Sequence, residues 1–287
     1  FWKTASAAAF GRFLGMSPTD SGDEILTQQN SAPPRPNLPT PAHADQLRSV
    51  LASAEYHESG VRELLKLEDF PSLRGGDLPL LLHRTARARP LDTLVRLFLM
   101  ERPVELEAAK KAFQPLHLET LVQMHLIAVR SGMVEGRIKL LPFQGLLIAF
   151  DQERYILETP GADYVMGIGR SSLTLANLTI RRSSRETLDL GTGCGVQGLL
   201  AAPHSEQITC TDLNERAVAM ASFNARLNAL SNVHCVRGHL FDPVQDRRFD
   251  LIVSNPPFVI SPESRYIYRD GVQPNVGAEI FDTGIAT

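Results

Sequence analysis

The stretch "TLDLGTGCG" (187–195) decides the fold, because an apolar strand pattern runs directly into a glycine-rich turn. Glycines placed directly after a strand can adopt φ > 0 and let the backbone approach a ligand closely. A second apolar run, "QITCTD" (207–212), ends in an acid 23 positions after Asp189 (212 − 189). A carboxylate at the tip of the second strand can accept both hydroxyls of a ribose. Together the turn and the acid favour a nucleoside-containing cofactor over a simple tight connection.

Segments with strand and helix patterns alternate around this stretch, from residue 156 onward. We expect a strand and glycine turn at 186–195, further strands at 207–212, 233–238 and 249–258, and helices at 196–205 and 214–230. This alternation predicts an α/β, Rossmann-like doubly wound sheet.

Residues 43–155 show a mainly helical pattern instead. We expect one helix that ends at Gly60, then helices at 92–102 with Asp92 as a possible N-cap, at 105–113 and at 118–132 with Gly132 at its exit, and finally a β-hairpin at 136–151. Three short helices before a hairpin are the order of a winged helix, a common nucleic-acid-binding module. Across 103–130 three glutamates balance two lysines and one arginine, which favours packing or protein contact over base reading.

The chain as a whole has an ordinary globular composition. Its 287 residues are 43% hydrophobic and 21% charged, with a net charge of −3, so no global positive field points to a nucleic-acid partner. Three cysteines without a C-x-x-C pair favour a reducing, cytoplasmic compartment. No apolar run approaches the roughly 20 residues of a membrane span, and the eight histidines show no metal-ligand spacing. We therefore expect no membrane and no metal.

Composition also divides the chain into three regions. The proline-rich segment 31–42 predicts a flexible linker, so residues 1–42 are expected to be a disordered tail. A helical domain with a hairpin is expected at 43–155 and the α/β domain at 156–287. The first residues carry bases but no acid before Asp20, which faintly resembles a transit peptide and equally fits a trimmed terminus.

Three ordered motifs give the α/β region a specific resemblance. "LDLGTGCG" (188–195), "TD" (211–212) and "NPPF" (255–258) resemble the class I S-adenosylmethionine-dependent methyltransferases, in the N-methylating branch with an Asn/Asp-Pro-Pro-aromatic motif. With "GIGRSSLTLANLTIR" (167–181) and "YRDG" (268–271), the chain looks like release-factor-type protein N5-glutamine methyltransferases with an added helical N-terminal domain. The resemblance covers roughly residues 160–273. It is specific for cofactor and reaction type and poorly specific for substrate.

The resemblance implies a binding site for S-adenosylmethionine. Its residues would be Asp189 toward the amino group, the turn Gly191, Thr192, Gly193 and Gly195 beside the methionine part, Asp212 at the ribose, and Leu213, His239 and Leu240 at the adenine. Many relatives carry an acid where this chain has His239, so adenine recognition would rest on the backbone of His239 and Leu240. A plain exposed loop histidine is an equally good interpretation.

The resemblance likewise implies a substrate and catalytic site at Asn255, Pro256, Pro257 and Phe258. An amide or exocyclic amino nitrogen has a delocalised lone pair, so acceptors aimed at its N–H groups must orient it and stabilise its developing charge. The Asn255 side-chain oxygen and the Pro256 carbonyl would be these acceptors, and Phe258 would stack on the planar group. Otherwise the two prolines only stop a strand.

Three functions follow as hypotheses. The first is methylation of a glutamine N5 in a protein partner, a translation release factor or a ribosomal protein. The second is methylation of an RNA or DNA base, at adenine N6 or guanine N2. The third is a non-catalytic nucleotide- or dinucleotide-binding protein, because "GCGVQG" (193–198) also matches G-x-G-x-x-G.

The resemblance also bears on the end of the chain. A complete sheet of the resembled class has seven strands, and 29 residues follow Phe258 (287 − 258). We therefore expect the methyltransferase domain to be incomplete at its C-terminus.

Overall fold

A computed structural model describes residues 35–38, 40–67, 78–158 and 163–257. Contacts divide the chain into two units, 1–31 and 32–287, and all described residues belong to the second. Residues 1–34 and 39 of the expected tail lie outside the described residues, and so does Phe258. At the described end of the tail, Leu38 is buried and helix α2 already begins at Pro41, before the expected start at residue 43.

The α/β region is built on a four-stranded parallel sheet, as the alternation predicted. Its strands are β6 (Ser184–Leu190), β7 (Ser205–Asp212), β8 (Val233–Arg237) and β9 (Leu251–Ser254), in the order β8-β7-β6-β9. The chain builds the sheet in one direction from β6 to β8 and then returns to the other side of β6 with β9, so the switch point lies between β6 and β9. Ligands of open α/β sheets bind at the carboxyl ends of the strands at such a switch point. Leu188, Ile208 and Cys210 are fully buried, as expected for strands covered by helices.

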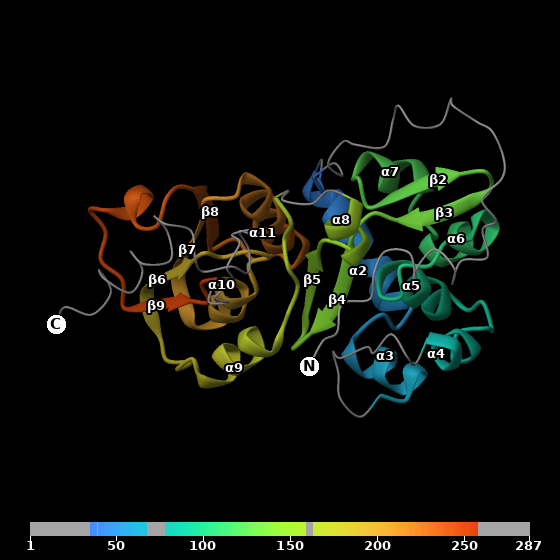
Figure 1. Cartoon of the computed structure of the whole chain (residues 1–287), viewed down its shortest axis with the longest axis horizontal. Helices are drawn as coiled ribbons and strands as arrows, with labels where there is room; N and C mark the ends of the chain where they lie inside the picture. Colours follow the sequence, from blue (N-terminus) through green and yellow to red (C-terminus); the bar gives the residue numbers. More distant parts are fainter. Residues whose placement is uncertain (1–34, 39, 68–77, 159–162, 258–287) are drawn as a thin grey trace. The chain divides into compact units, whose positions relative to one another are not determined.

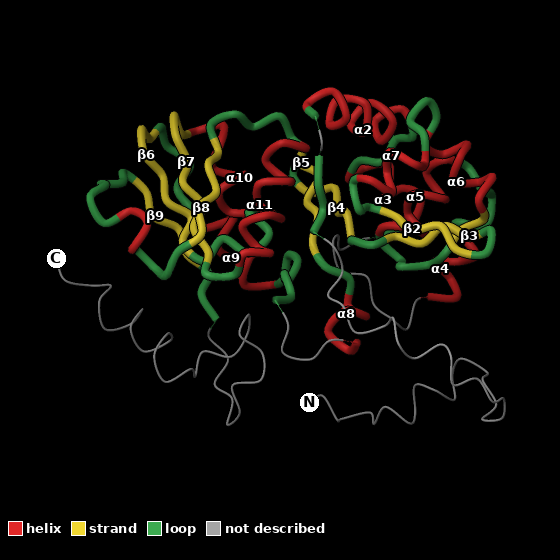
Figure 2. The backbone as a smooth tube through the Cα atoms, turned by 90° about the horizontal axis from the view of Figure 1, so that it is seen from above, coloured by secondary structure: helices red, strands yellow, loops and turns green. Residues whose placement is uncertain are grey.

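Helices connect these strands. The connections contain α10 (Val196–Ala201), the 3₁₀ turn η3 (Ala202–His204), α11 (Glu215–Leu227) and the 3₁₀ turn η4 (Asp242–Val244), and a further helix, α9 (Arg170–Leu178), precedes β6. The side chain of Asn214 caps α11 by accepting the Arg216 N–H at 2.8 Å. In both views α10 and α11 lie beside the sheet, between it and strands β4 and β5 (Figures 1 and 2).

The first part of the described chain is mainly helical, as predicted. It contains α2 (Pro41–Ser53), α3 (Glu58–Leu65), α4 (Leu78–Arg84), α5 (Pro90–Phe98), β1 (Val104–Glu105), α6 (Leu106–Phe113), α7 (Leu118–Gln123), β2 (Ile127–Arg130) and β3 (Met133–Gly136). From α5 to β3 this is the order of a winged helix, with an antiparallel sheet β1-β3-β2.

The winged-helix prediction was wrong about which residues form the hairpin. The expected helix 118–132 ends at Gln123, and its second half is strand β2 paired with β3. His125 takes φ 59, which breaks the helical path, and Gly132 with φ 77 makes the hairpin turn instead of a helix exit. The predicted strands at 136–151 exist as β4 (Lys139–Phe143) and β5 (Leu146–Phe150), but they form a separate two-stranded sheet.

Two predicted helix ends were also wrong. Gly60 does not stop a helix, because α2 ends at Ser53 and Gly60 lies within α3. Asp92 is not the N-cap of α5, because Arg89 occupies that position and Asp92 accepts the Arg89 N–H at 3.0 Å from the third helical position. The helix also stops at Phe98, before Pro103.

A short helix, α8 (Glu153–Glu158), follows β5 before the α/β region begins. None of the helices within the described ranges is long and apolar enough to cross a membrane.

Candidate functional site

The glycine turn lies between the ends of β6 and β7. The N–H groups of Gly191 and Thr192 both donate to the Thr211 carbonyl at 2.9 Å. Gly191 and Gly193 have φ of 70° and 56°, which other residues rarely adopt. A side chain added at either position would meet no atom within 4 Å, so the space above the turn is open to a ligand.

Asp189 lies under this turn and holds it. Its Oδ2 accepts the Thr192 hydroxyl at 2.6 Å and the Gly198 N–H at 2.9 Å. The carboxyl is 1% exposed, and this burial raises the pKa of Asp189 to about 6, while the two hydrogen bonds oppose the rise. Both hydrogen bonds fall on Oδ2, so Oδ1 remains as an acceptor for a ligand in the cavity.

Asp212 ends strand β7 on the other side of the turn. Its Oδ2 accepts the Gly193 N–H and its Oδ1 accepts the Asn214 N–H, both at 2.9 Å. Burial raises the pKa of Asp212, and the backbone N–H groups of Gly193, Asn214 and Leu213 counteract the rise. Each oxygen keeps a lone pair, so the fixed carboxylate can still accept two ligand hydroxyls.

These groups line a cavity of about 560 Å³, within the range of small-molecule sites. Of the predicted residues, the cavity wall contains Asp189, Gly191, Thr192, Gly193, Asp212, Leu213, His239, Leu240, Asn255, Pro256 and Pro257. Gly195 is not among the lining residues. It starts α10 with φ 86, and a Cβ there would lie 2.7 Å from Leu199 Cδ1 and 3.0 Å from Ala221, so the glycine allows close helix packing.

Asn255 reaches the cavity from the end of β9. Its Nδ2 donates to the hydroxyls of Ser171 and Ser172 in the first turn of α9, at 3.3 and 3.2 Å. Both of these hydrogen bonds use Nδ2, so Oδ1 is left as an acceptor. The Ser172 backbone is held in turn, because its carbonyl accepts the Gln197 Nε2 at 2.9 Å.

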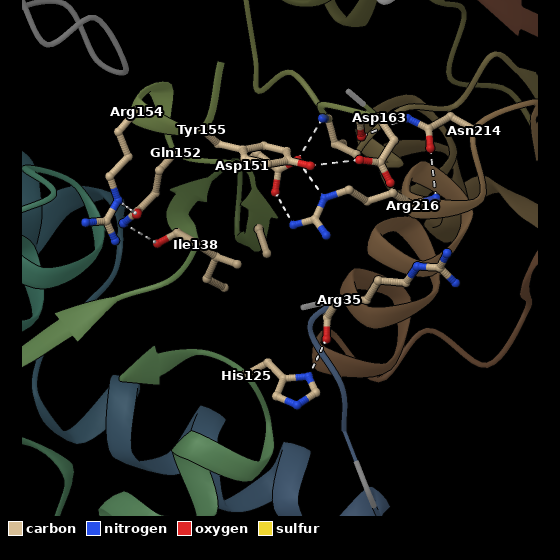
Figure 3. Close-up of polar contacts among 12 residues, drawn as sticks. Arg35, His125, Ile138, Asp151, Gln152, Arg154, Tyr155, Asp163, Asn214 and Arg216 are labelled. Carbon is tan, nitrogen blue, oxygen red and sulfur yellow. Dashed lines mark hydrogen bonds and ion pairs between the residues drawn. The ribbon is translucent and has the colours of Figure 1, made fainter. Parts of the chain in front are cut away.

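Sequence reasoning missed several lining residues. They include Arg35, Asp163, Ser172, Thr211, Asn214 and Arg237. Arg35 comes from the segment before α2, where its Nη1 contacts Glu215 Oε1 at 2.6 Å and its carbonyl lies 2.7 Å from the His125 ring (Figure 3). No motif announces such residues, but Asn214 stands directly before an amphipathic helix and could have been identified as its N-cap.

The cavity wall fits a nucleoside cofactor with a cationic amino-acid end. It supplies two fixed carboxylates, the open space above Gly191 and Gly193, and the Thr211 hydroxyl. That hydroxyl is buried and makes no hydrogen bond within the described part of the chain, so a ligand can satisfy it. Burial raises the pKa of the Cys194 thiol to about 12, so Cys194 is not a nucleophile at neutral pH.

Comparisons with known proteins agree with this geometry. The methyltransferase small domain family matches residues 167–269, and a domain of unknown function (DUF7059) matches residues 53–137. The release factor glutamine methyltransferase of Bordetella pertussis is 42% identical over 95 residues, which cover 31% of this chain and 34% of that protein.

Two further relatives carry related names. The release factor glutamine methyltransferase of Geobacter sulfurreducens is 32% identical over 146 residues, covering 46% of this chain and 47% of that protein. The ribosomal protein uL3 glutamine methyltransferase of Francisella tularensis is 41% identical over 75 residues, covering 25% of this chain and 24% of that protein. The chain thus covers less than half the length of each of these three relatives.

The cavity at the switch point of a parallel sheet, the two strand-end carboxylates and the family match lead to one assignment. Residues 167–269 form a class I S-adenosylmethionine-dependent methyltransferase domain, and this part of the chain is similar in sequence to proteins named glutamine methyltransferases.

Proposed function

We propose that the protein transfers a methyl group from S-adenosylmethionine to the side-chain amide nitrogen of a glutamine in a protein substrate. One observation carries the proposal: Asn255 lines the cavity, and its Nδ2 donates to the hydroxyls of Ser171 and Ser172. Its oxygen is then the group offered to a substrate. An acceptor suits a nucleophile that carries N–H groups, as an amide nitrogen does.

Cofactor binding rests on the two strand-end acids. Asp212 accepts the ribose hydroxyls, since its carboxylate is already fixed by Gly193 and Asn214. Asp189 faces the amino group of the methionine part, and Gly191 and Gly193 let the backbone lie against it. When bound, S-adenosylmethionine supplies an electrophilic methyl group on a sulfonium.

The residues after β9 prepare the nucleophile. The Asn255 oxygen and the Pro256 carbonyl accept the two N–H groups of the glutamine amide, which turns its nitrogen toward the methyl group and stabilises the positive charge it gains. The fixed φ of Pro256 and Pro257 limits the freedom lost on binding. Phe258, outside the described residues, is proposed to cover the flat amide. No strong general base is needed, because the nitrogen becomes acidic as it is methylated.

The names of the relatives support a protein substrate, with release factors and ribosomal protein uL3 as the first to test. In the test, tritium from labelled S-adenosylmethionine is followed into release factor, ribosomal protein and ribosomal RNA. Label in a glutamine of a protein supports the proposal, and label in RNA alone overturns it. Calorimetry with S-adenosylhomocysteine and with NAD is the parallel measurement, and a preference for NAD would point to a dinucleotide-binding protein instead.

Replacing the acceptor tests the mechanism. Asn255→Ala should lower kcat by about 10²- to 10³-fold, as removal of one group that stabilises transition-state charge does elsewhere. The Kd for S-adenosylhomocysteine should change little, because Asp189 and Asp212 remain. A collapse of cofactor binding in this variant would show that Asn255 serves the cofactor rather than the substrate.

A further inference from the structure

We propose that Asp151 and Tyr155, which lie outside the matched methyltransferase region, are positioning residues that hold the 163–167 wall of the cofactor cavity. Neither residue lines the cavity. The inference rests on the proposed function for its meaning, but the contacts that carry it belong to the protein alone.

The wall needs external support because it has no regular structure of its own. Residues Asp163, Tyr164, Val165, Met166 and Gly167 all line the cavity, and none belongs to a helix or strand. Irregular segments with few hydrogen bonds of their own open most easily in folded proteins. The wall's position must therefore come from its neighbours.

Asp151, directly after β5, supplies the first support. Its Oδ2 accepts the Val165 N–H at 2.8 Å, and its own N–H donates to the Val165 carbonyl at 3.1 Å. The same carboxylate accepts Nε and Nη2 of Arg216 at 2.9 and 2.6 Å. Both side chains of this ion pair are 1% exposed, so the pair joins the wall to the first turn of α11 inside the protein.

Tyr155, in helix α8, supplies the second support. Its hydroxyl donates to Asp163 Oδ1 at 2.8 Å, and its ring lies 5.3 Å from the Arg216 guanidinium carbon (Figure 3). Burial and the neighbouring Asp163 raise the pKa of Tyr155 above its usual value, so the hydroxyl keeps its proton and donates at neutral pH.

Asn214 connects the wall to Asp212, the carboxylate proposed to bind the ribose. The Asp163 carbonyl accepts Nδ2 of Asn214 at 3.0 Å, and the Asn214 N–H donates to Asp212 Oδ1 at 2.9 Å. A shift of Asp163 is therefore passed to the residue that fixes Asp212. This continuous path explains how α8 can influence a cofactor that it does not touch.

A purely structural role would predict lost stability without a specific change in the wall. Tyr155→Phe distinguishes a positioning role from a purely structural one, because it keeps the ring over Arg216 and removes only the hydrogen bond to Asp163. The matched control is Arg154→Ala on the same helix. The Arg154 side chain turns away from the wall, to the Gly136 carbonyl at 2.7 Å and Gln152 Oε1 at 2.8 Å (Figure 3).

The first measurement needs no ligand. Hydrogen exchange of a peptide that covers 163–167 should be about threefold to tenfold faster in Tyr155→Phe than in the wild type, with unchanged exchange in strands β6 and β7. Arg154→Ala should leave the wall peptide as it is. Equal wall exchange in the wild type and Tyr155→Phe would overturn the inference.

The second measurement asks whether the wall matters to the cofactor. In Tyr155→Phe the Kd for S-adenosylhomocysteine and the KM for S-adenosylmethionine should rise about threefold to tenfold, with kcat and the KM for the protein substrate unchanged. Faster wall exchange without any change in Kd would overturn the positioning role. A wild type that binds no S-adenosylhomocysteine would instead contradict the proposed function, and the exchange measurement would still decide the inference.

Discussion

At the scale of single residues, two carboxylates define the site, the buried Asp189 and the half-buried Asp212, and they are held in different ways. Asp189 takes both of its hydrogen bonds on one oxygen, whereas Asp212 takes one on each. Each is thereby fixed in a different orientation toward the cavity. Burial raises the pKa of both carboxyls, and it raises the pKa of Asp189 to about 6. Asp189 therefore gives the fold a measurable dependence on pH.

Asp189→Asn should remove this dependence. Below about pH 3 the carboxyl is protonated in the folded and unfolded chains alike, so its ionisation costs the fold nothing. As the pH rises toward 6 the unfolded chain ionises first, and the wild type loses stability until Asp189 ionises in the fold as well. The unfolding free energy of Asp189→Asn minus that of the wild type should therefore grow by about 2 kcal/mol between pH 4 and pH 7.

Urea unfolding of both proteins at several pH values checks this prediction. Asp212 is present in both proteins, so the part of its titration that does not depend on the Asp189 charge cancels in the difference. A difference that stays constant from pH 4 to pH 8 would mean that the pKa of Asp189 is not raised by folding.

The serines behind Asn255 give a second residue-scale prediction. Ser172→Ala removes one of the two hydroxyls that accept a hydrogen bond from Asn255 Nδ2, so the amide loses part of its fixed orientation. We expect kcat to fall about twofold to tenfold, the effect of one ordinary hydrogen bond, with cofactor Kd unchanged. In an Asn255→Ala background the same change should have no further effect on kcat.

The exposed Thr174 of the same helix provides the control, since Thr174→Ala should leave kcat as it is. An equal loss of kcat from Ser172→Ala with and without Asn255 would show that the serine acts through another residue.

At the scale of elements, sequence patterns predicted the strands and helices of the α/β region because each period is long and each end is marked. The helix predicted for residues 118–132 was wrong in its second half, because the apolar spacing there suits either a helix or a strand. The positive φ at His125, which decides between them, has no signature in a histidine. The predicted site residues that directly follow strands do line the cavity, because the strand pattern fixes their place. Asp163 and Ser172 were missed because only tertiary contacts bring them to the cavity.

One contact between elements could not be read from any pattern. The side chain of Asn224 in α11 accepts the Ala149 N–H at 2.8 Å and donates to the Ala149 carbonyl at 2.9 Å and the Cys194 carbonyl at 2.8 Å. One turn later, Asn228 makes the same pair of bonds to Leu147, both at 2.8 Å. Two amides thus pair with the backbone of β5 in place of a neighbouring strand.

Asn224→Ala should therefore be strongly destabilising. It leaves two carbonyls and one N–H buried without partners, each worth about 1–3 kcal/mol, so we expect a loss of about 3 kcal/mol or more. Asn228→Ala should cost less because its site is only partly buried, and Arg226→Ala on the exposed face of α11 should be nearly neutral. Denaturant unfolding checks the order, and a neutral Asn224→Ala would contradict the pairing.

At the scale of the whole described molecule, the helical region and the α/β region are joined through buried and partly buried polar groups. Besides the two asparagines, Arg48 of α2 donates to the Leu227 carbonyl at 2.9 Å, and Arg216 of α11 pairs with Asp151 after β5. Buried polar groups are expensive to separate, because each would have to find a new partner. The parts of unit 32–287 that the structure describes should accordingly unfold together.

Arg216→Met tests this cooperativity. It leaves the buried Asp151 carboxylate without its counter-charge, a change that costs about 3–5 kcal/mol in buried pairs. Because the pair joins both regions, hydrogen exchange at increasing urea should show the same lowered midpoint for peptides from β2–β3 and from β6–β7. The exposed pair Glu107–Lys110 is the control. Lys110→Met should change the unfolding free energy of either region by no more than about 0.5 kcal/mol. If Arg216→Met lowered the midpoint of the β6–β7 peptides alone, the two regions would be separate folding units, and the buried pair would serve only the cavity side.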